Sequence, residues 1–418
     1  MSDIFIPMKI LQLSPRIPYP LTEGGSIGIF NITRQLSERG ALIYFVAVSG
    51  NRDTDCPKEL SKLCQSVLVT KASKRYSFAA AARNLFSPVP INVEKYHSRK
   101  ILKEIISFAS DKQIDLIHVD HLHMAYYGLA LGKLLMVPVA LREHNLELKI
   151  MERFSESSGN PAYRAYAKSQ MKKFLKYEPS ICAQMDKCVM ITEQDRDRLL
   201  SMRRDVDAVV IPAGVDTDFF KPADSIGDEN TIIYVGGLDW LPNIDGLKWF
   251  VDEVMPIITE SKRNVRLIIY GKGDPRSVDR LGNGKNVIVE GYIHDVRQAF
   301  MKGRVMVVPL LAGSGIRIRI LEAMAAGKPI VTTSIGSEGI KIEPGKNIMI
   351  ADTANQFAEK VLLLLNDENL CRTVSKEAGS FVSSEYSWHR IGDMFWRAYN
   401  EIIDKRAKSS RDNARMGS

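Results

Sequence analysis

The sequence predicts an α/β protein built from two doubly wound domains, each with a mostly parallel sheet between layers of helices. Three observations predict this class. Short apolar strands are followed by glycine-containing turns and helical apolar stripes in both halves of the chain. This alternation stops in a polar stretch near residues 216–230 and then starts again. The chain has 418 residues, which is long for a single hydrophobic core.

These observations give the expected domain boundaries. We expect a first domain over residues 8–215, a linker over 216–230 and a second domain over 231–385. A C-terminal helix follows over 386–405, because apolar residues recur there at helical spacing. Residues 406–418 are polar, and we expect them to form a disordered tail.

Composition and cysteine usage indicate a cytoplasmic globular protein. Hydrophobic residues make up 45% and charged residues 25% of the chain. The longest apolar run, Leu129–Leu141, is broken by Lys133 and Pro138, so no stretch reaches the ~20 residues of a membrane helix. The five cysteines are scattered and odd in number, which favours neither a disulfide framework nor a zinc site.

The formal net charge of +8 leaves three kinds of partner open. A solvated basic surface is the plain interpretation, an anionic lipid surface is the second, and nucleic acid is the third. No recognised nucleic-acid motif is present, so we expect no nucleic acid partner. Basic and apolar residues occur together near 74–86 and 162–177, and both stretches are candidates for contact with an anionic membrane surface. For 74–86 the alternative is an amphipathic helix packed on its own domain. For 162–177 the alternatives are a solvated helix face and a phosphate-bearing acceptor.

The first domain begins with the strand Lys9–Leu13 and a loop that contains Gly24 and Gly25. A helix is expected from about Ile27, with Gly40 as its stop. Strand, glycine loop and helix in this order are typical of dinucleotide-binding sheets, but the Gly-x-Gly-x-x-Gly fingerprint is absent. Taken alone, the two glycines are a plain turn.

Polar residues crowd the end of a later strand, Asp115–Asp120. His118 and Asp120 alternate onto one face, and His121 and His123 follow. Open α/β sheets bind ligands at this end of their strands. A metal site, structural histidines and contact with a substrate are the three alternatives that the residues leave open.

The stretch Pro309–Gly339 organises the second domain. An apolar strand ends at Pro309, a small glycine-rich turn contains Gly313, Ser314 and Gly315, and a helix is expected from Ile316 to Gly327. Such a turn directs free N–H groups and the positive end of a helix at a bound anion, especially phosphate.

Glu322 lies seven positions beyond Gly315, on the same side of the expected helix. A carboxylate does not bind phosphate, but it accepts hydrogen bonds from sugar hydroxyls. A phosphate cradle beside a hydroxyl acceptor is the combination that a nucleotide-sugar requires.

The residues GSGIRIRILEAMAAGKPIV resemble the donor-site motif of the retaining glycosyltransferases of family 4, also called group 1, which have the GT-B fold. The motif has a Glu, seven residues, a second Glu, then Ala-Met-Ala, Gly and Pro. Glu322 matches the second acid, and Ser314 stands at the first, a departure that resembles an exopolysaccharide or capsule subfamily with Gly-Ser-Gly. The resemblance covers about residues 8–405 and implies two domains facing a cleft, with the last helix crossing back to the first domain.

The resemblance also implies roles for residues at matching positions. Asp120 or His121 would orient the acceptor, with His118, His144 and Asn145 on the acceptor side. The donor would be bound by residues of both domains: Gly24, Gly25, Gly236, Gly237, Asn243, Gly291, Tyr292, Gly313, Ser314, Gly315, Ile316, Arg319 and Glu322.

Typical members carry an Arg and a Lys that neutralise the diphosphate. Here these positions fall on Gly237 and Asn243, so another group must supply the charge. Arg317, beside the glycine turn, is our first candidate and Arg319 the second. Arg319 can instead pair with Glu322 at i, i+3.

We therefore expect a hexosyltransferase that moves a sugar from a nucleotide-diphospho-sugar to a glycan or lipid-linked glycan, with retention. No metal or other cofactor is expected, and the expected location is the cytoplasm, at the inner face of the cell membrane. Two alternatives remain: a non-catalytic protein that binds a nucleotide-sugar or glycan, and a nucleotide-sugar epimerase of the same fold.

Overall fold

A computed structural model of the chain describes residues 7–21, 24–50, 55–72, 78–157, 161–223, 226–273, 278–282, 284–313 and 315–416. The chain divides into two compact units. The first comprises the residues up to Pro212 together with those from Ile391 onward, and the second is Ala213–Arg390. The division lies just before the segment 216–230 that we predicted as a linker.

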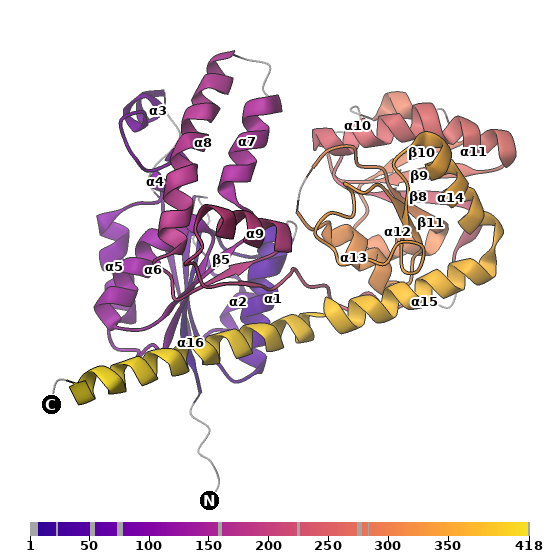
Figure 1. Cartoon of the computed structure of the whole chain (residues 1–418). Coiled ribbons are helices and arrows are strands. Elements are labelled where there is room, and N and C mark those ends of the chain that lie inside the picture. Colours follow the sequence, from indigo (N-terminus) through magenta and orange to yellow (C-terminus); the bar gives the residue numbers. More distant parts are fainter. Residues whose placement is uncertain are drawn as a thin grey trace, which may run out of the picture. The chain divides into compact units, whose positions relative to one another are not determined.

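The first unit contains a seven-stranded parallel sheet in the order β3-β2-β1-β4-β5-β6-β7. Its strands are β1 (Lys9–Ser14), β2 (Leu42–Ser49), β3 (Ser66–Lys71), β4 (Leu116–Asp120), β5 (Val139–Glu143), β6 (Lys187–Met190) and β7 (Ala208–Val210). The helices around it are α1 (Gly24–Glu38), α2 (Lys58–Ser61), α3 (Phe78–Asn84), α4 (Ile91–Glu94), α5 (Arg99–Ala109), α6 (Ala125–Leu135), α7 (Glu147–Ser157), α8 (Pro161–Cys182) and α9 (Glu193–Met202) (Figure 1).

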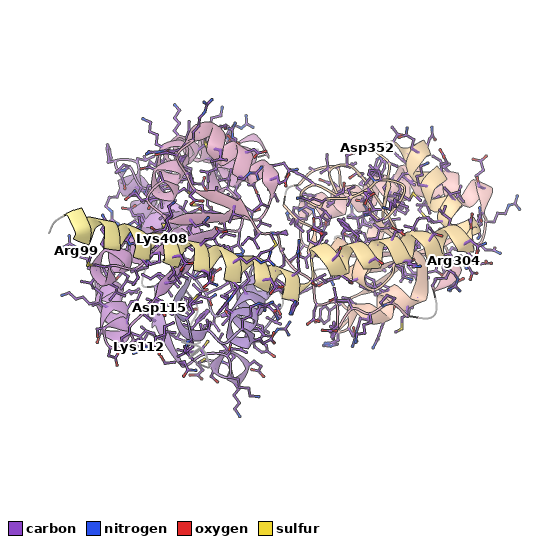
Figure 2. The ribbon with its side chains drawn as sticks, turned by 60° about the horizontal axis from the view of Figure 1, so that its bottom comes forward. Arg99, Lys112, Asp115, Arg304, Asp352 and Lys408 are labelled. Carbon is purple, nitrogen blue, oxygen red and sulfur yellow. The ribbon has the colours of Figure 1, made fainter. Side chains whose placement is uncertain are left out.

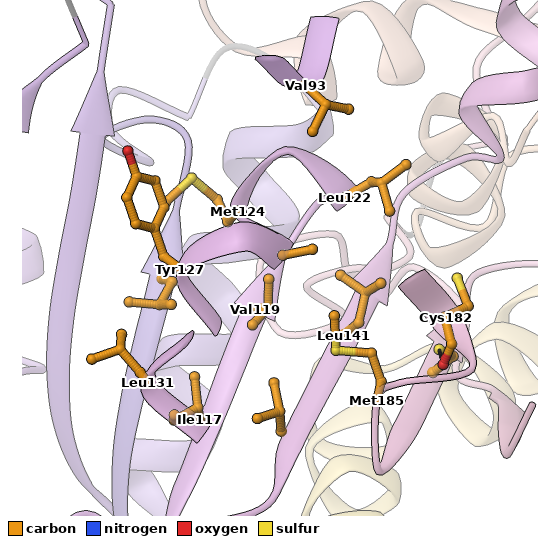
Figure 3. Packing of buried hydrophobic residues seen from close by; sticks show 14 of the residues in the cluster. Val93, Ile117, Val119, Leu122, Met124, Tyr127, Leu131, Leu141, Cys182 and Met185 are labelled. Atoms are coloured by element: carbon orange, nitrogen blue, oxygen red, sulfur yellow. Dashed lines mark hydrogen bonds between the residues drawn. The ribbon is translucent and has the colours of Figure 1, made fainter. Parts of the chain in front are cut away.

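The core of this unit lies between the sheet and its helices, as Figure 3 shows for Val119 and Leu141 of neighbouring strands and Leu131 of α6. Helix α6 lies close to the sheet because Gly128 has no side chain: a Cβ atom there would be 2.4 Å from a methyl carbon of Val119.

The second unit contains a six-stranded parallel sheet in the order β10-β9-β8-β11-β12-β13. Its strands are β8 (Asp228–Val235), β9 (Arg266–Tyr270), β10 (Val287–Gly291), β11 (Gly303–Val308), β12 (Ile330–Thr332) and β13 (Met349–Ile350). Its helices are α10 (Leu241–Trp249), α11 (Met255–Ser261), α12 (Val296–Lys302), α13 (Ile318–Ala325), α14 (Ala354–Asn366) and α15 (Glu368–Glu385).

Both faces of this second sheet are covered. Adjacent residues of β8 belong to different hydrophobic clusters. Ile232 packs with Phe250 and Phe357 on one face, and Ile233 packs with Ile320 of α13 on the other. This is the doubly wound arrangement that the sequence predicts.

The last helix, α16 (Trp388–Met416), returns to the first unit, as expected. Asp393 accepts a hydrogen bond from Arg39 at 2.8 Å, and Glu401 accepts one from Lys187 at 3.3 Å. The part of α16 that carries Lys408 runs along the unit that contains Arg99 and Asp115 (Figure 2). The expectation of a disordered tail over 406–418 is wrong as far as Met416, because helix α16 continues to that residue.

Candidate functional site

In each sheet the strand order reverses at one point, and doubly wound sheets bind ligands outside the carboxyl ends of the strands at this point. The reversal lies between β1 and β4 in the first unit and between β8 and β11 in the second. The loops after these four strands carry most of the residues that we predicted for the site. The two units are described separately.

The glycine turn after β11 is not packed into the core: Leu311 and Ala312 are exposed, and Gly313 and Gly315 are half-buried. Gly313 and Gly315 have φ values of +142° and +81°, which favour glycine. Ser314 lies outside the described residues. We expected the helix to begin at Ile316, but α13 begins at Ile318 with Arg317 before it as N-cap. Its first free N–H groups therefore belong to Ile318 and Arg319, whereas Ile320 N already donates to Arg317 O at 2.8 Å.

Arg317 is held against the turn. Its Nη1 donates to Gly315 O at 3.3 Å, and its guanidinium carbon lies 5.2 Å from the ring centre of Trp240. The charges of Arg319 and Arg317 also lower the pKa of the Tyr234 hydroxyl, which burial raises overall. Both guanidinium groups therefore lie near the end of β8, at the switch point.

Arg319 and Glu322 form an ion pair at i, i+3, which is the alternative that we named for Arg319. Glu322 is only 8% exposed. Burial raises its pKa, and the Arg319 charge opposes this rise. The carboxylate is thus fixed in position, with its charge balanced by a partner on the same helix.

The loops after β8, β9 and β10 are joined by backbone hydrogen bonds. Gly236 N donates to Tyr270 O at 3.0 Å, and Gly271 N donates to Gly291 O at 2.7 Å. A Cβ atom on Gly271 would be 2.0 Å from Gly236 O, so only glycine allows this approach. These contacts bring the predicted residues Gly236 and Gly291 to one edge of the sheet.

Asn243 of α10 does not replace the expected cation with another charge. Its Nδ2 donates to Gly237 O at 2.8 Å and thereby fixes the loop after β8. Tyr292, after β10, is exposed and lies edge-on to His294, with ring centres 5.0 Å apart. Arg317 and Arg319 are two cations that lie near Tyr234, at this edge of the sheet.

In the first unit, Gly24 and Gly25 form the first turn of α1 rather than a loop before it, and the helix does not start at Ile27 as predicted. Its first turn has no acidic residue. A Cβ atom on Gly25 would be 3.7 Å from Nη1 of Arg16, so this guanidinium lies beside the start of the helix. The sequence analysis missed Arg16, although the loop between β1 and two glycines was a signal.

Asp120 at the end of β4 is fully buried and holds the middle of a polar network. Its Oδ2 accepts a hydrogen bond from Gln12 Nε2 at 2.8 Å and lies 3.1 Å from His118 Nε2. Its Oδ1 lies 3.6 Å from Arg142 Nη1 and 3.6 Å from His144 Nε2. These charges and hydrogen bonds keep the pKa of Asp120 well below its usual value, although burial acts in the opposite direction.

Two predictions for this strand are therefore wrong as direct contacts. Asp120 has no exposed surface with which to orient an acceptor. His118 is also fully buried, and its Nδ1 contacts the hydroxyl of Tyr399 on α16. Both residues instead stabilise the edge of the sheet from its buried side, and Asp120 holds His144 in place.

His121 and His144 remain as candidates for contact with a substrate. Their rings stack with centres 3.7 Å apart, and His123 lies 6.0 Å from His121. Burial lowers the pKa of all three, to about 4 for His144 and about 3 for His123, so the rings are neutral. His121 has φ +68°, and its Nδ1 has no hydrogen-bond partner among the residues that the structure describes. Asn145 follows at the same edge and is half-buried.

The sequence analysis missed Glu147, the first residue of α7. Its Oε1 lies 3.9 Å from His123 Nε2, and burial raises its pKa to about 7. Behind it, both carboxylate oxygens of the buried Glu178 accept backbone hydrogen bonds at the start of α7, from Glu147 N at 2.8 Å and Leu148 N at 3.1 Å. Glu147 is the last residue of the stretch HNLE after β5, and no periodicity there distinguishes it from a surface residue.

No group of three or more His, Cys, Asp and Glu side chains suited to hold a metal ion occurs in the described part of the chain. No helix there is long and apolar enough to span a bilayer.

Two doubly wound parallel sheets, with glycine turns at the switch points and a last helix that returns to the first unit, define the class: an α/β protein of the GT-B type. Residues 22–219 match the family model described as "Glycosyltransferase Family 4", and residues 229–367 match "Glycosyl transferases group 1". The chain belongs to these glycosyltransferases.

The chain is also similar to individual proteins. The chain is 22% identical over 393 residues to an "Uncharacterized 44.6 kDa protein in cps region" of Klebsiella pneumoniae. This match covers 92% of this chain and 97% of the relative. It is 26% identical to a phosphatidyl-myo-inositol mannosyltransferase of Mycobacterium leprae, over 48% of this chain and 56% of that one.

Solved structures show the same fold. Sucrose-phosphate synthase from Thermosynechococcus elongatus matches with a TM-score of 0.72 at 17% identity, over 95% of this chain and 100% of that one. HepE of Anabaena in complex with UDP-glucose matches with a TM-score of 0.65 at 15% identity, over 94% and 100%.

Proposed function

We propose that this glycosyltransferase moves a hexose from a nucleoside-diphosphate sugar to a hydroxyl of a glycan or lipid-linked glycan, with retention at the anomeric carbon. In this reaction the bond from the anomeric carbon to the diphosphate breaks, and a bond to the acceptor oxygen forms as that hydroxyl loses its proton. The observation that carries the proposal is the arrangement of Gly313, Gly315 and Arg317 beside the switch point of the second sheet. The UDP and UDP-glucose complexes of HepE are consistent with a nucleotide-sugar donor.

The chemical demand is the departure of a doubly charged nucleoside diphosphate. Preorganised donors aimed at developing charge stabilise such a transition state, and one of them is commonly worth ~3 kcal/mol. In the proposal, Arg317 and the free N–H groups of Ile318 and Arg319 meet the diphosphate, and no metal ion is required. Glu322 accepts hydrogen bonds from the ribose hydroxyls, and Ser314 contacts the sugar.

We assign the acceptor to the first unit, where His121 and His144 are half-buried at the edge of the sheet. The neutral ring of His144 stacks on His121, whose buried Nδ1 has no hydrogen-bond partner among the described residues. In the proposal, the acceptor contacts His121. All five cysteines are free thiols, which supports a cytoplasmic location, at the inner face of the cell membrane. The relative in a cps region supports a role in polysaccharide synthesis.

The proposal is tested by incubating the purified chain with nucleotide-sugars and lipid-linked or soluble glycan acceptors. Mass spectrometry detects the product, and the anomeric proton coupling in its NMR spectrum gives the configuration. We expect a product with the configuration of the donor. An inverted product would contradict retention, and hydrolysis or epimerisation of the donor without transfer would contradict the transferase.

One observation favours a second candidate, a protein that binds a nucleotide-sugar without turning it over. The two positions that carry cations in typical members are Gly237 and Asn243, and Asn243 is committed to a neutral hydrogen bond with Gly237 O. Tight binding of a nucleotide-sugar with no product from any acceptor would favour this candidate.

A further inference from the structure

A row of basic residues follows one side of α8 in the first unit. Arg164, Lys168, Lys172 and Lys176 recur at intervals of four residues, and all four are exposed. Among the residues that the structure describes, none forms an ion pair with Lys168, Lys172 or Lys176. Three of the buried residues of this helix, Ala167, Gln170 and Phe174, lie on its other side. At Lys168, Lys172 and Lys176, this part of α8 therefore presents positive charge that no described residue pairs with.

The end of α3 lies beside the same part of α8 (Figure 1) and is attached to it by hydrogen bonds. The fully buried side chain of Asn84 makes the attachment. Its Oδ1 accepts hydrogen bonds from Gln170 Nε2 at 3.0 Å and Lys173 Nζ at 2.9 Å. Its Nδ2 donates to Val89 O at 2.8 Å and to Glu94 Oε2 at 2.6 Å. Four partners fix this turn, so the residues that follow are held in place.

The two residues directly after Asn84 are large, apolar and exposed. Leu85 is 50% exposed and Phe86 is 92% exposed. Leu175, between Lys172 and Lys176, is 47% exposed. A single exposed leucine is ordinary, but a phenylalanine held in solvent by a fixed turn beside uncompensated lysines is not. We call the set Leu85, Phe86, Lys168, Lys172, Leu175 and Lys176 the basic–apolar face.

We propose that the basic–apolar face docks on an anionic phospholipid bilayer. Apolar side chains enter the boundary between headgroups and acyl chains, and lysines near the surface are attracted by anionic lipid. A soluble polyanion would use the lysines but would leave Phe86 in water. A second copy of the chain would oppose like charges. This face does not depend on the proposed sugar transfer, because it lies on α8 and on the turn after α3, outside the predicted donor and acceptor residues.

The test is co-sedimentation of the full chain with vesicles. We expect the protein to bind vesicles of phosphatidylcholine that contain about one-third phosphatidylglycerol, and this binding should weaken at raised salt. It should bind pure phosphatidylcholine vesicles little. The double variant Lys172→Glu/Lys176→Glu should bind anionic vesicles at least about tenfold more weakly, since each lysine near the surface contributes. Phe86→Ser should weaken binding without changing its salt dependence.

Matched controls come from the same unit. Lys58 and Lys62 are exposed lysines with the same spacing, and Leu134 is an apolar residue as exposed as Leu85. Lys58→Glu/Lys62→Glu and Leu134→Ser should leave vesicle binding within about twofold of the unchanged chain. Equal losses in the controls, or no binding of the unchanged chain to anionic vesicles, would overturn the proposal. The face would be assigned to a soluble polyanion instead if two results were found together. Soluble polyphosphate would compete fully with anionic vesicles for the protein, and Phe86→Ser would have no effect on vesicle binding.

Discussion

A Cβ atom on Gly313 would lie 2.1 Å from Nη2 of Arg317, and 3.1 Å from the ring of Trp240. The guanidinium therefore occupies the space that any other residue at position 313 would fill. Glycine at this position serves the placement of a charged side chain as well as a backbone conformation with φ +142°.

Gly313→Ala should displace Arg317 and weaken binding of a nucleoside diphosphate by about tenfold, the scale of one hydrogen bond to a charged group. Isothermal titration measures the affinity. Gly345→Ala is the matched control, because Gly345 also has positive φ but a Cβ atom there meets nothing within 4 Å. Equal effects of the two variants would show that backbone strain, rather than Arg317, is responsible.

Glu322→Gln should weaken nucleoside diphosphate affinity about tenfold, because an amide is a poorer acceptor for ribose hydroxyls and loses the charge that holds Arg319. A comparison of affinities for a nucleoside diphosphate and for inorganic pyrophosphate separates the two causes. The proposed role requires that only nucleoside diphosphate binding falls. Glu359→Gln, on the exposed surface of α14, should leave both unchanged.

Glu147 should make the folded state less stable as pH rises. Its pKa is raised from 4.5 to about 7 by burial, so the folded chain holds a proton there that the unfolded chain has lost. This contribution is fully present below pH 4.5 and is lost as pH rises to about 7, which amounts to about 3 kcal/mol. The raised pKa of Glu178, about 8, acts in the same direction.

Urea unfolding at pH 5 and pH 8 measures this effect. Glu147→Gln should remove part of the loss between the two values, since it has no proton to lose. An identical loss in the variant would show that Glu147 ionises alike in both states. Asp120, with its lowered pKa, contributes in another range: it stabilises above its unfolded pKa, near 4, and that contribution is lost in acid.

Tyr399→Phe should destabilise the chain by about 1–3 kcal/mol, because it leaves Nδ1 of the buried His118 without its hydroxyl partner. Chemical denaturation measures the loss. Tyr163→Phe, on the exposed part of α8, is a control that should change little. If Tyr399→Phe were neutral, the contact between α16 and β4 would not contribute to stability.

The fold was predictable because its signals are local. The strand Lys9–Leu13, the turn at Gly313 and the helix through Leu321 each follow from apolar periodicity and from glycine, and the family motif around Glu322 gave the fold. Helix starts were less accurate: α1 begins three residues earlier than expected and α13 two residues later. The first turn of a helix has no periodicity by which to recognise it.

The polar network of the first unit was not predictable. His118 and Asp120 alternate onto one face of β4, which indicated a shared site, yet whether that face is open depends on Arg142 of β5 and Tyr399 of α16. Tyr399 is 281 residues from His118 in the chain, so no local pattern reveals that it buries the histidine. Glu147 was missed for the same reason, since its burial depends on neighbours from other elements.

The central claim is that Arg317, held by the glycine turn, meets the diphosphate of the donor. Its most direct test is isothermal titration of the full chain and of Arg317→Ala with a panel of nucleoside diphosphates and the corresponding nucleosides. We predict that at least one diphosphate binds, that Arg317→Ala weakens this binding by about tenfold or more, and that affinity for the nucleoside is unchanged. Equal affinity of both proteins for the diphosphate, or no binding of any diphosphate to the unchanged chain, would contradict the claim.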